Sequence, residues 1–326
     1  MPDASAGTPA RLGLGAKIFI AATLSVMGVL GVTLGLTSVQ AERTADESIR
    51  RALAGVRRGV QAFLTGRTVA FTGMSAVSAF DRELQEAVAI KTLRPEALAG
   101  GGVALERFKQ EIRLARKIAH RNVVRTYDLG EVNGMYYLTM EYVEGTSLKQ
   151  LIATRGPLPL PVTLTIGKQL CRALEMAHEQ GVIHRDIKPH NIVVEPSGVL
   201  KVIDFGIARL ANRSKDEGLT KEGMSIGTPD YMSPEQLSGM GLDARSDLYS
   251  AGVVLFECLT RRLPFEADTT YALIAKHLEQ APPDPRSFNP DVPEALAQVI
   301  LKAMAREAND RYQSAAQMHD ALAAIG

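Results

Sequence analysis

The stretch HRDIKPHN at residues 184–191 decides how this chain is interpreted. It brings a carboxylate, an ammonium group and an amide into one short segment around a proline. The carboxylate of Asp186 can accept the proton of an attacking hydroxyl group, and Lys188 can neutralise charge on a phosphoryl group. Asn191 can hold a metal ion through its amide oxygen. We therefore interpret this segment as catalytic.

A second motif, Asp204-Phe205-Gly206, follows a short apolar strand predicted at residues 200–203. Asp204 offers a hard oxygen ligand of the kind that suits Mg²⁺. Such a triplet alone arises by chance in roughly a few per cent of chains of this size. The longer run followed by this triplet at this spacing has a negligible chance rate, so the two motifs predict one site.

Two weaker signals lie upstream. Lys91 ends the apolar run 88–91, within a strand predicted at residues 86–93. Glu111 borders the apolar face of a helix predicted at residues 105–120. A carboxylate held there needs a partner, because an unpaired buried charge is costly. A lysine on the neighbouring strand would supply that partner.

Together these motifs make the segment from about residue 80 to residue 326 resemble the eukaryotic-like (Hanks-type) Ser/Thr protein kinases of bacteria. The resemblance implies an α+β, bilobal protein-kinase fold, with an N-lobe at residues 80–142 and a mainly helical C-lobe at residues 143–326. It implies transfer of the ATP γ-phosphoryl group to Ser or Thr hydroxyls of protein substrates. The implied metal ion is Mg²⁺, with Mn²⁺ as an alternative.

The resemblance also implies roles for single residues that match the family's motifs. The expected residues of phosphoryl transfer are Lys91 at the phosphates with Glu111 as its helix partner, Asp186 as the base, Lys188 beside it, and Asn191 and Asp204 as metal ligands. The backbone of Glu141 and Val143 would bind adenine. Thr228, near the end of the activation segment, would brace the catalytic loop.

Other matches imply scaffold and regulation. Asp247 would anchor the backbone of the catalytic loop, and Glu235 and Arg311 would form a buried ion pair. Arg185 commonly pairs with a phosphorylated activation segment in this family. Its expected phosphorylation sites here are Thr220 and Ser225, with Ser214 a weaker candidate; the alternative is that these are ordinary solvated hydroxyls.

The chain departs from the family at the Gly-rich loop. Residues 64–77 contain no G-x-G-x-x-G motif, although the family places one upstream of the strand lysine. We expect a truncated N-lobe sheet, in which the first strand and most of the second are missing or replaced. The alternative function is that of a pseudokinase, or an inactive fused or truncated kinase, which acts as a binding module.

The N-terminal part has a different composition. Residues 1–17 resemble a disordered tail, and residues 18–39 are apolar and uncharged, long enough for a transmembrane helix. A buried core helix and a signal peptide are the alternatives. Residues 40–79 are predicted to be a helical juxtamembrane or sensor-like segment. Five arginines shortly after residue 39 predict a single-pass membrane protein with a cytoplasmic kinase domain.

Residues 44–64 carry an apolar heptad seam that could support a homodimeric coiled coil or one amphipathic helix lying on lipid.

The formal net charge is +1, from 37 basic and 36 acidic residues, and gives no reason to expect nucleic acid as a partner. Cys171 and Cys258 lie in apolar patterns and are predicted to be buried, reduced thiols.

Further elements follow from residue periodicity. The predicted strands lie at residues 123–128 and 135–142 and are joined across Asn133-Gly134. The predicted helices lie at residues 162–180, where Gly181 ends the helix, and at residues 246–260, which are apolar almost all round and should form a buried central helix.

Overall fold

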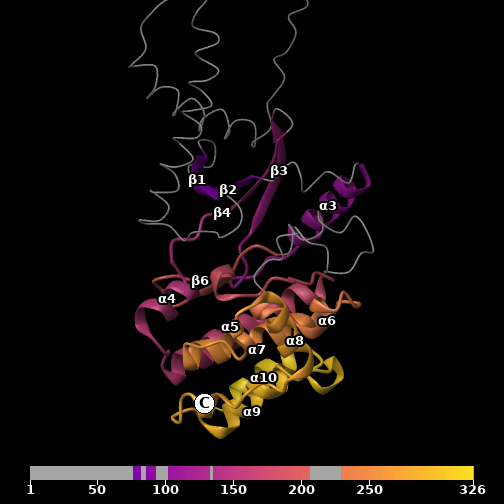
Figure 1. Cartoon of the computed structure of the whole chain (residues 1–326). Helices are drawn as coiled ribbons and strands as arrows, with labels where there is room; N and C mark the ends of the chain where they lie inside the picture. Colours follow the sequence, from indigo (N-terminus) through magenta and orange to yellow (C-terminus); the bar gives the residue numbers. More distant parts are fainter. Residues whose placement is uncertain (1–75, 82–85, 93–101, 133–134, 206–228, 326) are drawn as a thin grey trace, which may run out of the picture. The chain divides into compact units, whose positions relative to one another are not determined.

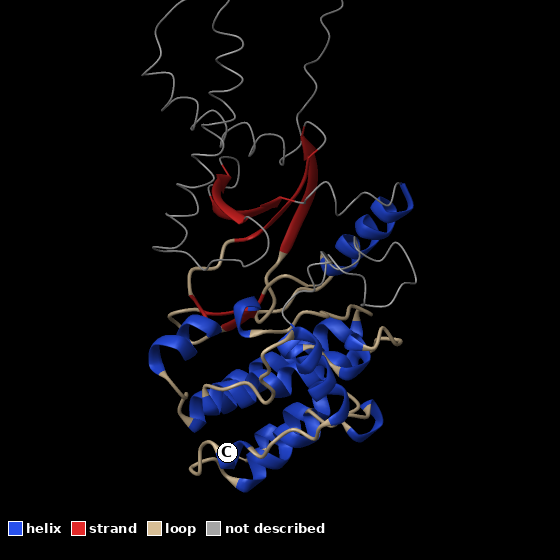
Figure 2. Ribbon diagram, in the orientation of Figure 1, coloured by secondary structure: helices blue, strands red, loops and turns tan. Residues whose placement is uncertain are grey.

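The computed structural model describes residues 76–81, 86–92, 102–132, 135–205 and 229–325 (Figure 1). These residues fall into two compact units. The first unit holds residues 76–81, 86–92, 127–132 and 135–142, and the second holds residues 102–126, 143–205 and 229–325. Strands make up the first unit and helices dominate the second (Figure 2).

The first unit is a four-stranded sheet with the order β1-β2-β4-β3. Its strands are β1 (Ala76–Asp81), β2 (Glu86–Thr92), β3 (Thr126–Val132) and β4 (Met135–Glu141). β2 is antiparallel to both β1 and β4, and Lys91 lies opposite Leu138. The successive residues Val88, Ala89 and Ile90 are all buried, although successive side chains point to opposite faces. Both faces of β2 therefore exclude solvent, which is why its sequence is continuously apolar.

The prediction that most of the strand before β2 is missing is wrong. β1 pairs with β2 from Ala76 opposite Lys91 to Asp81 opposite Glu86. Residues 76–79, which we predicted to be the end of a helical segment, therefore belong to the sheet. A strand that is buried on both faces needs a hydrogen-bonded neighbour along each edge, and β1 supplies the second one.

The predictions for the N-terminal part of the chain concern residues that the structure does not describe. Residues 1–75, which include the tail, the predicted membrane helix and the region expected to hold a Gly-rich loop, are outside the described residues. Within the described ranges no helix is long and apolar enough to cross a membrane. The membrane helix at residues 18–39 therefore stays a prediction from sequence.

Helix α7 (Ala244–Thr260) is the centre of the second unit. Every residue from Ser246 to Thr260 is buried, which confirms the prediction of a buried central helix. α5 (Leu160–Glu179) and α9 (Glu294–Ala303) pack against α7, and α10 (Ala315–Ala323) packs against α5 and α9 (Figure 1). A Cβ on Gly252 would lie 2.8 Å from Met304 Cγ, so this glycine allows the close approach of α7 and α9.

The remaining elements of this unit are short. The helices are α3 (Gly102–Ala115), α4 (Leu148–Arg155), α6 (Pro234–Leu237) and α8 (Thr270–Glu279). The 3-10 turns are η2 (Pro189–Asn191), η4 (Pro229–Tyr231), η5 (Pro285–Ser287) and η6 (Ala308–Asp310). Several helices begin where a hydroxyl oxygen accepts a backbone N–H of the first turn, as Ser147, Ser233, Thr269 and Ser314 do.

A small antiparallel sheet lies beside η2. Its strands, in spatial order, are β5 (Thr146–Ser147), β6 (Ile192–Val194) and β7 (Leu200–Val202). Val124 N donates to Val202 O at 2.9 Å, and Val123 forms a parallel bridge with Val202. The strand predicted at residues 123–128 therefore splits: its first residues pair with β7, and β3 starts only at Thr126. Periodicity identifies an apolar run but not the partner that the run will take.

Other element predictions are confirmed with small shifts. The helix predicted at residues 162–180 is α5, and Gly181 follows it with a φ of 72°, while its N–H donates to His178 O at 2.9 Å. The helix predicted at residues 105–120 is α3, which ends earlier, at Ala115. Cys171 and Cys258 are buried free thiols, and burial raises the pKa of Cys171 to about 12.

The predicted buried ion pair between Glu235 and Arg311 is confirmed. Arg311 Nη1 and Nη2 lie 2.7 and 2.8 Å from the two carboxylate oxygens of Glu235. Arg311 also donates to the backbone carbonyls of Ala305 and Arg306. Burial alone would raise the pKa of Glu235, but the hydrogen bonds from Arg311 and Ser246 hold it below its usual value. The pair ties α6 to the C-terminal helices.

We expect Arg311→Met to lower the free energy of unfolding by about 3–5 kcal/mol, because Glu235 would keep a half-buried charge without its partner. The matched control is Arg306→Met, whose ion pair with Glu307 is exposed; it should cost less than about 0.5 kcal/mol. Urea unfolding followed by circular dichroism measures both. Equal effects of the two substitutions would contradict this account of the pair.

Burial of His277 should make stability depend on pH. Its side chain is 1% exposed, its Nδ1 lies 3.0 Å from Tyr249 OH, and among the described residues its Nε2 has no hydrogen-bond partner. Burial lowers the pKa of His277 from 6.5 to about 4. Below pH 6.5 this histidine therefore binds a proton in the unfolded chain, whereas in the folded chain it stays neutral down to about pH 4.

We expect this histidine to reduce the free energy of unfolding by about 3 kcal/mol as the pH falls from 6.5 to 4. In His277→Gln, which cannot titrate, that part of the pH dependence should be absent. His319→Gln, at a more exposed histidine on α10, should keep the wild-type dependence. Urea titrations across this pH range provide the measurement, and parallel curves for wild type and His277→Gln would disprove the prediction.

Candidate active site

The segment at residues 184–191 is held by one buried carboxylate, that of Asp247 on α7. Asp247 is 1% exposed. Its Oδ2 accepts a hydrogen bond from His184 N and its Oδ1 one from Arg185 N, both at 2.8 Å. His178 Nε2, from the last turn of α5, lies 2.8 Å from Oδ2. The predicted anchoring role of Asp247 is therefore confirmed, and α5 takes part in it.

These contacts keep Asp247 ionised. Burial alone would raise the pKa of Asp247, but the hydrogen bonds from His178 and the His184 amide outweigh it and lower the pKa. Asp247 also lies in the first turn of α7, where the helix dipole favours a negative charge. The anchor is thus a charged acceptor at neutral pH, and its hydrogen bonds are of the strong, charge-assisted kind.

His184 links the two sequence motifs through its ring. Burial lowers its pKa, so the imidazole is neutral at pH 7 and has one donor and one acceptor. Nε2 lies 2.9 Å from Ile203 O, and Nδ1 lies 3.2 Å from Asp186 N. Since a carbonyl only accepts and an amide N–H only donates, the proton is on Nε2. The ring also packs against Phe205 in a tilted arrangement, with 4.6 Å between centroids and 58° between the ring planes.

The carboxylate of Asp186 is oriented by two neighbours. Lys188 Nζ lies 2.9 Å from its Oδ2, and Asn191 Nδ2 donates to the same oxygen at 2.9 Å. Among the described residues Oδ1 has no partner, so this oxygen can accept a proton from a hydroxyl group. The structure thus brings together the predicted base and two of its predicted neighbours.

The donor set fits a magnesium ion. Asn191 Nδ2 also donates to Asp186 O at 2.8 Å, which fixes the amide orientation and leaves Oδ1 as the acceptor. Ile203 N donates to Asn191 O at 2.9 Å. This bond places the residue before Asp204 next to Asn191 in the segment 184–191. An amide oxygen and a carboxylate are ligands that Mg²⁺ takes together with substrate phosphates. Across the described ranges there is no cluster of three or more His, Cys, Asp or Glu residues suited to a metal ion.

Two residues of the site have left-handed backbone conformations. Arg185 has a φ of 66° and Asp204 a φ of 64°. For side chains other than glycine this conformation costs about 1–2 kcal/mol per residue. At Arg185 hydrogen bonds offset that cost, because its N–H donates to Asp247 and its carbonyl accepts from Gln236 Nε2 at 2.8 Å. The two left-handed residues directly precede Asp186 and Phe205, so they set the direction of the backbone within both motifs.

The remaining predicted site residues belong to other elements of the chain. Lys91, on β2, and Glu141, at the end of β4, belong to the first unit, and Val143 follows in the second. Lys91 is buried, with 3% exposed. Glu111 lies on α3, and its side chain is outside the described structure. Their roles toward nucleotide therefore stay predictions.

The predicted residues of the activation segment belong to a part of the chain outside the described residues. Thr228, Thr220, Ser225 and Ser214 lie within residues 206–228, outside the described residues. The chain re-enters the described structure at η4. The bracing role of Thr228 and the two regulatory sites therefore remain predictions, as does the pairing of Arg185 with a phosphorylated side chain.

Sequence reasoning missed a buried network next to the catalytic segment. Glu257 on α7 is 3% exposed, and Lys149 Nζ on α4 lies 2.6 Å from its Oε1. Tyr231 OH, from η4, donates to its Oε2. Burial, Lys149 and Lys188 lower the pKa of His190 beside this network. The one available signal was an acidic residue inside an otherwise apolar helix pattern, which indicates a buried partner but not its identity.

Comparison with known proteins agrees with this geometry. The family model described as protein kinase domain matches residues 72–322. The chain belongs to the protein kinase family. The match starts ahead of β1, which agrees with a domain that begins before residue 80.

Several bacterial kinases are similar to this protein kinase domain. Serine/threonine-protein kinase PrkC of Bacillus subtilis is 40% identical over 253 residues, which cover 77% of this chain and 38% of that protein. Serine/threonine-protein kinase PksC of Streptomyces coelicolor is 42% identical over 257 residues, 76% of this chain and 46% of that protein. The resemblance to bacterial Ser/Thr kinases is therefore confirmed, and the chain matches less than half the length of these relatives.

A solved structure shares the fold. The crystal structure of Rad53 1-466 in complex with AMP-PNP aligns with a TM-score of 0.61 and 24% identity, over 76% of this chain and 60% of that one. At this identity the likeness concerns the fold alone. It confirms an α+β kinase fold with a helical C-lobe.

We expect Asp247→Asn to reduce kcat for phosphoryl transfer roughly a hundredfold, because a small displacement of the catalytic segment is enough for such a loss. An asparagine offers one acceptor oxygen, so either His184 N or Arg185 N would face an NH₂ group. The KM for nucleotide should change far less than kcat. Steady-state kinetics measures both constants.

The control is Asp243→Asn, at the N-cap of the same helix, where asparagine is an equally good cap. It should leave kcat and stability near the wild-type values. If both variants lose activity equally, or if Asp247→Asn retains full kcat, the anchoring role is refuted.

Proposed function

We propose that this chain is a Ser/Thr protein kinase that transfers the γ-phosphoryl group of ATP to Ser or Thr hydroxyls of proteins. The observation that carries the proposal is the Asp186 carboxylate, held through Oδ2 by Lys188 and Asn191 with Oδ1 left to accept a proton. Similarity to bacterial Ser/Thr kinases over about three quarters of the chain supports the same function.

The chemistry assigned to these residues is a single displacement. The substrate hydroxyl oxygen forms a bond to the γ-phosphorus, and the bond from that phosphorus to the β–γ bridging oxygen breaks, which releases ADP. Asp186 Oδ1 takes the hydroxyl proton. Lys188, ion-paired with Oδ2 at 2.9 Å, holds the carboxylate in place and offsets negative charge on the group in transfer.

Nucleotide and metal would be held by the predicted residues. Mg²⁺, or Mn²⁺, would be bound by Asn191 and Asp204 and would supply positive charge at the phosphate oxygens. Lys91, supported by Glu111, would contact the α and β phosphates, and the backbone of Glu141 and Val143 would bind adenine. The Rad53 structure is a complex with AMP-PNP, which supports nucleotide binding by this fold.

The alternative is a binding module without activity. Its supporting observation is the absence of a G-x-G-x-x-G motif from residues 64–77, since backbone N–H groups of that loop cover the ATP phosphates in active kinases. A kinase-fold binding module has no need for the ordered Asp186 carboxylate, so the geometry favours the enzyme.

We further propose membrane anchoring and regulation from sequence. Residues 18–39 would form a single transmembrane helix in the plasma membrane, with the kinase domain in the cytoplasm. The heptad seam at residues 44–64 would bring two copies together as a homodimer. Phosphorylation of Thr220 or Ser225 would pair with Arg185 and raise signalling activity.

Removal of the base is the decisive test. Asp186→Ala should reduce transfer of ³²P from γ-labelled ATP to a Ser-containing protein roughly a thousandfold, the usual contribution of a positioned base. Asp291→Ala, at an exposed aspartate remote in sequence, should be fully active. Chelation of divalent metal by EDTA should abolish transfer, and added Mg²⁺ should restore it.

Binding of a fluorescent ATP analogue with Mg²⁺ separates the enzyme from the binding module. If wild type and Asp186→Ala transfer phosphate equally, the enzyme assignment fails. If the analogue binds and no transfer occurs under any metal condition, the chain is a binding module.

A further inference from the structure

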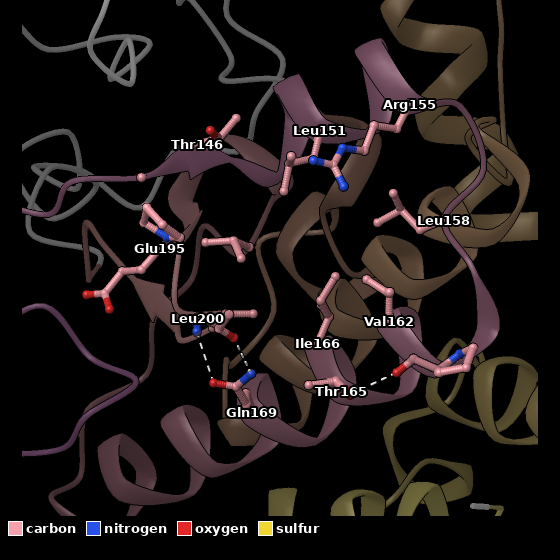
Figure 3. Close-up of a pocket in the computed structure, with 15 residues that line it drawn as sticks. Thr146, Leu151, Arg155, Leu158, Val162, Thr165, Ile166, Gln169, Glu195 and Leu200 are labelled. Atoms are coloured by element: carbon pink, nitrogen blue, oxygen red, sulfur yellow. Dashed lines mark hydrogen bonds between the residues drawn. The ribbon is translucent and has the colours of Figure 1, made fainter.

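A groove lies on the second unit, between α4, the first half of α5 and the β6–β7 hairpin (Figure 3). Its volume is about 640 Å³, enough for several side chains. Its walls are largely apolar and include Leu151, Leu158, Pro161, Val162, Ile166 and Leu200. Val162 keeps 45% of its surface exposed. None of the residues that line the groove belongs to the predicted active site.

Two polar side chains on the α5 wall of the groove, Gln169 and Thr165, are hydrogen-bonded within the protein. Gln169 accepts from Leu200 N at 2.9 Å and donates to Gly198 O at 3.0 Å. Thr165 Oγ1 donates to Pro161 O at 2.8 Å (Figure 3). A small polar ligand needs convergent free polar groups to orient it, and these two offer none. The surface is suited instead to apolar side chains of a polypeptide.

The charges at one end of the groove are unbalanced. Arg155 lines it one turn after Leu151 (Figure 3), and among the described residues its guanidinium has no hydrogen-bond or ion-pair partner. Glu195, the acidic residue in the lining, accepts a hydrogen bond from Ser197 Oγ at 3.1 Å. Figure 3 shows its carboxylate directed away from Val162 and Leu158 on the opposite wall.

The groove continues into a second hollow of about 320 Å³, which shares Thr165, Gln169 and Gly198 with it. Arg121 and Lys168 line this hollow, and none of its lining residues is acidic. Arg121 makes no hydrogen bond or ion pair with the described residues. The whole surface is therefore apolar in the middle and positively charged toward both ends.

We propose that this groove docks a linear segment of a protein substrate in which apolar side chains are flanked by acidic ones. The identification of the partner as a substrate rests on the proposed function. The shape and charge of the groove are independent of that function. Charge complementarity argues for this occupant, because acidic flanks would meet Arg155 at one end and Arg121 at the other. Docking there would hold the substrate at a second point besides the hydroxyl that is phosphorylated.

The chain's own amphipathic segment is a poorer match. Residues 44–64 have an apolar seam but carry four arginines against two acidic residues. They would bring like charge to the two ends of the groove, which disfavours that occupant. A second copy of the chain is tested directly by the experiment below.

The probe is an array of short synthetic peptides with two leucines near the middle and aspartate, alanine or lysine at both ends, bound to the full chain. Aspartate-ended peptides should bind about fivefold more tightly than alanine-ended ones, the gain from two exposed ion pairs, and lysine-ended ones should bind worst. Val162→Asp should weaken binding of aspartate-ended peptides about tenfold, because a charge would enter an apolar wall.

The double variant Arg121→Glu with Arg155→Glu should reverse the preference toward lysine-ended peptides. Tyr271→Asp is the matched control, since Tyr271 is 82% exposed and outside the groove; it should leave binding unchanged. Phosphate transfer to a short Ser peptide without a docking segment should be the same in Val162→Asp and wild type. Circular dichroism melts establish that each variant is folded.

Equal binding of the three peptide classes, or full binding by Val162→Asp, would overturn the proposal. So would self-association that Val162→Asp abolishes, because the occupant would then be a second copy. Peptide preference without phosphate transfer would leave the groove standing and sink the kinase assignment. Phosphate transfer without any peptide preference would support the kinase assignment and overturn the docking groove.

Discussion

The catalytic half of the second unit depends on one buried carboxylate, that of Asp247. A charge with 1% exposure is tolerated only when hydrogen bonds replace the water it has lost. Asp247 receives these bonds from His178 and from two successive backbone N–H groups, those of His184 and Arg185. The contact fixes the backbone immediately before Asp186 and holds Arg185 in a left-handed conformation that it would otherwise avoid.

Two further carboxylates, the half-buried Glu235 and the buried Glu257, form ion pairs around α7. Glu235 joins α6 to Arg311, and Glu257 joins α4 to η4 through Lys149 and Tyr231. The first pair holds α6 and the second holds α4 and η4, and all three elements belong to the same unit as the catalytic segment. Breaking one partner of such a pair costs far more than the pair contributes in net stability, so these contacts define the geometry more than they raise the stability. The proposed docking groove differs, since its guanidinium groups at Arg155 and Arg121 lack partners in the described structure.

The helices α3, α5 and α7 could be predicted from sequence, because a helix that packs on a core has a local apolar spacing. α7 and α5 appear within a few residues of their predicted ends. Strands were harder to predict, since a strand is stable only with its neighbours. β1 was missed although it pairs along β2, and the apolar run at residues 123–128 divides between two sheets.

The sequence by itself determined the family, and it indicated that Asp186, Lys188 and Asn191 act together, because they lie in one short segment and the predicted chemistry requires that spacing. It also pointed to Asp247 and to the pair of Glu235 with Arg311 through their match to the family. Only the tertiary structure decided which atoms are used: the proton on His184 Nε2 and, among the described residues, the free Oδ1 of Asp186. It also decided that Glu257 meets Lys149, which is 108 residues away in sequence. Such partners depend on how helices pack, and residue spacing along the chain does not encode that.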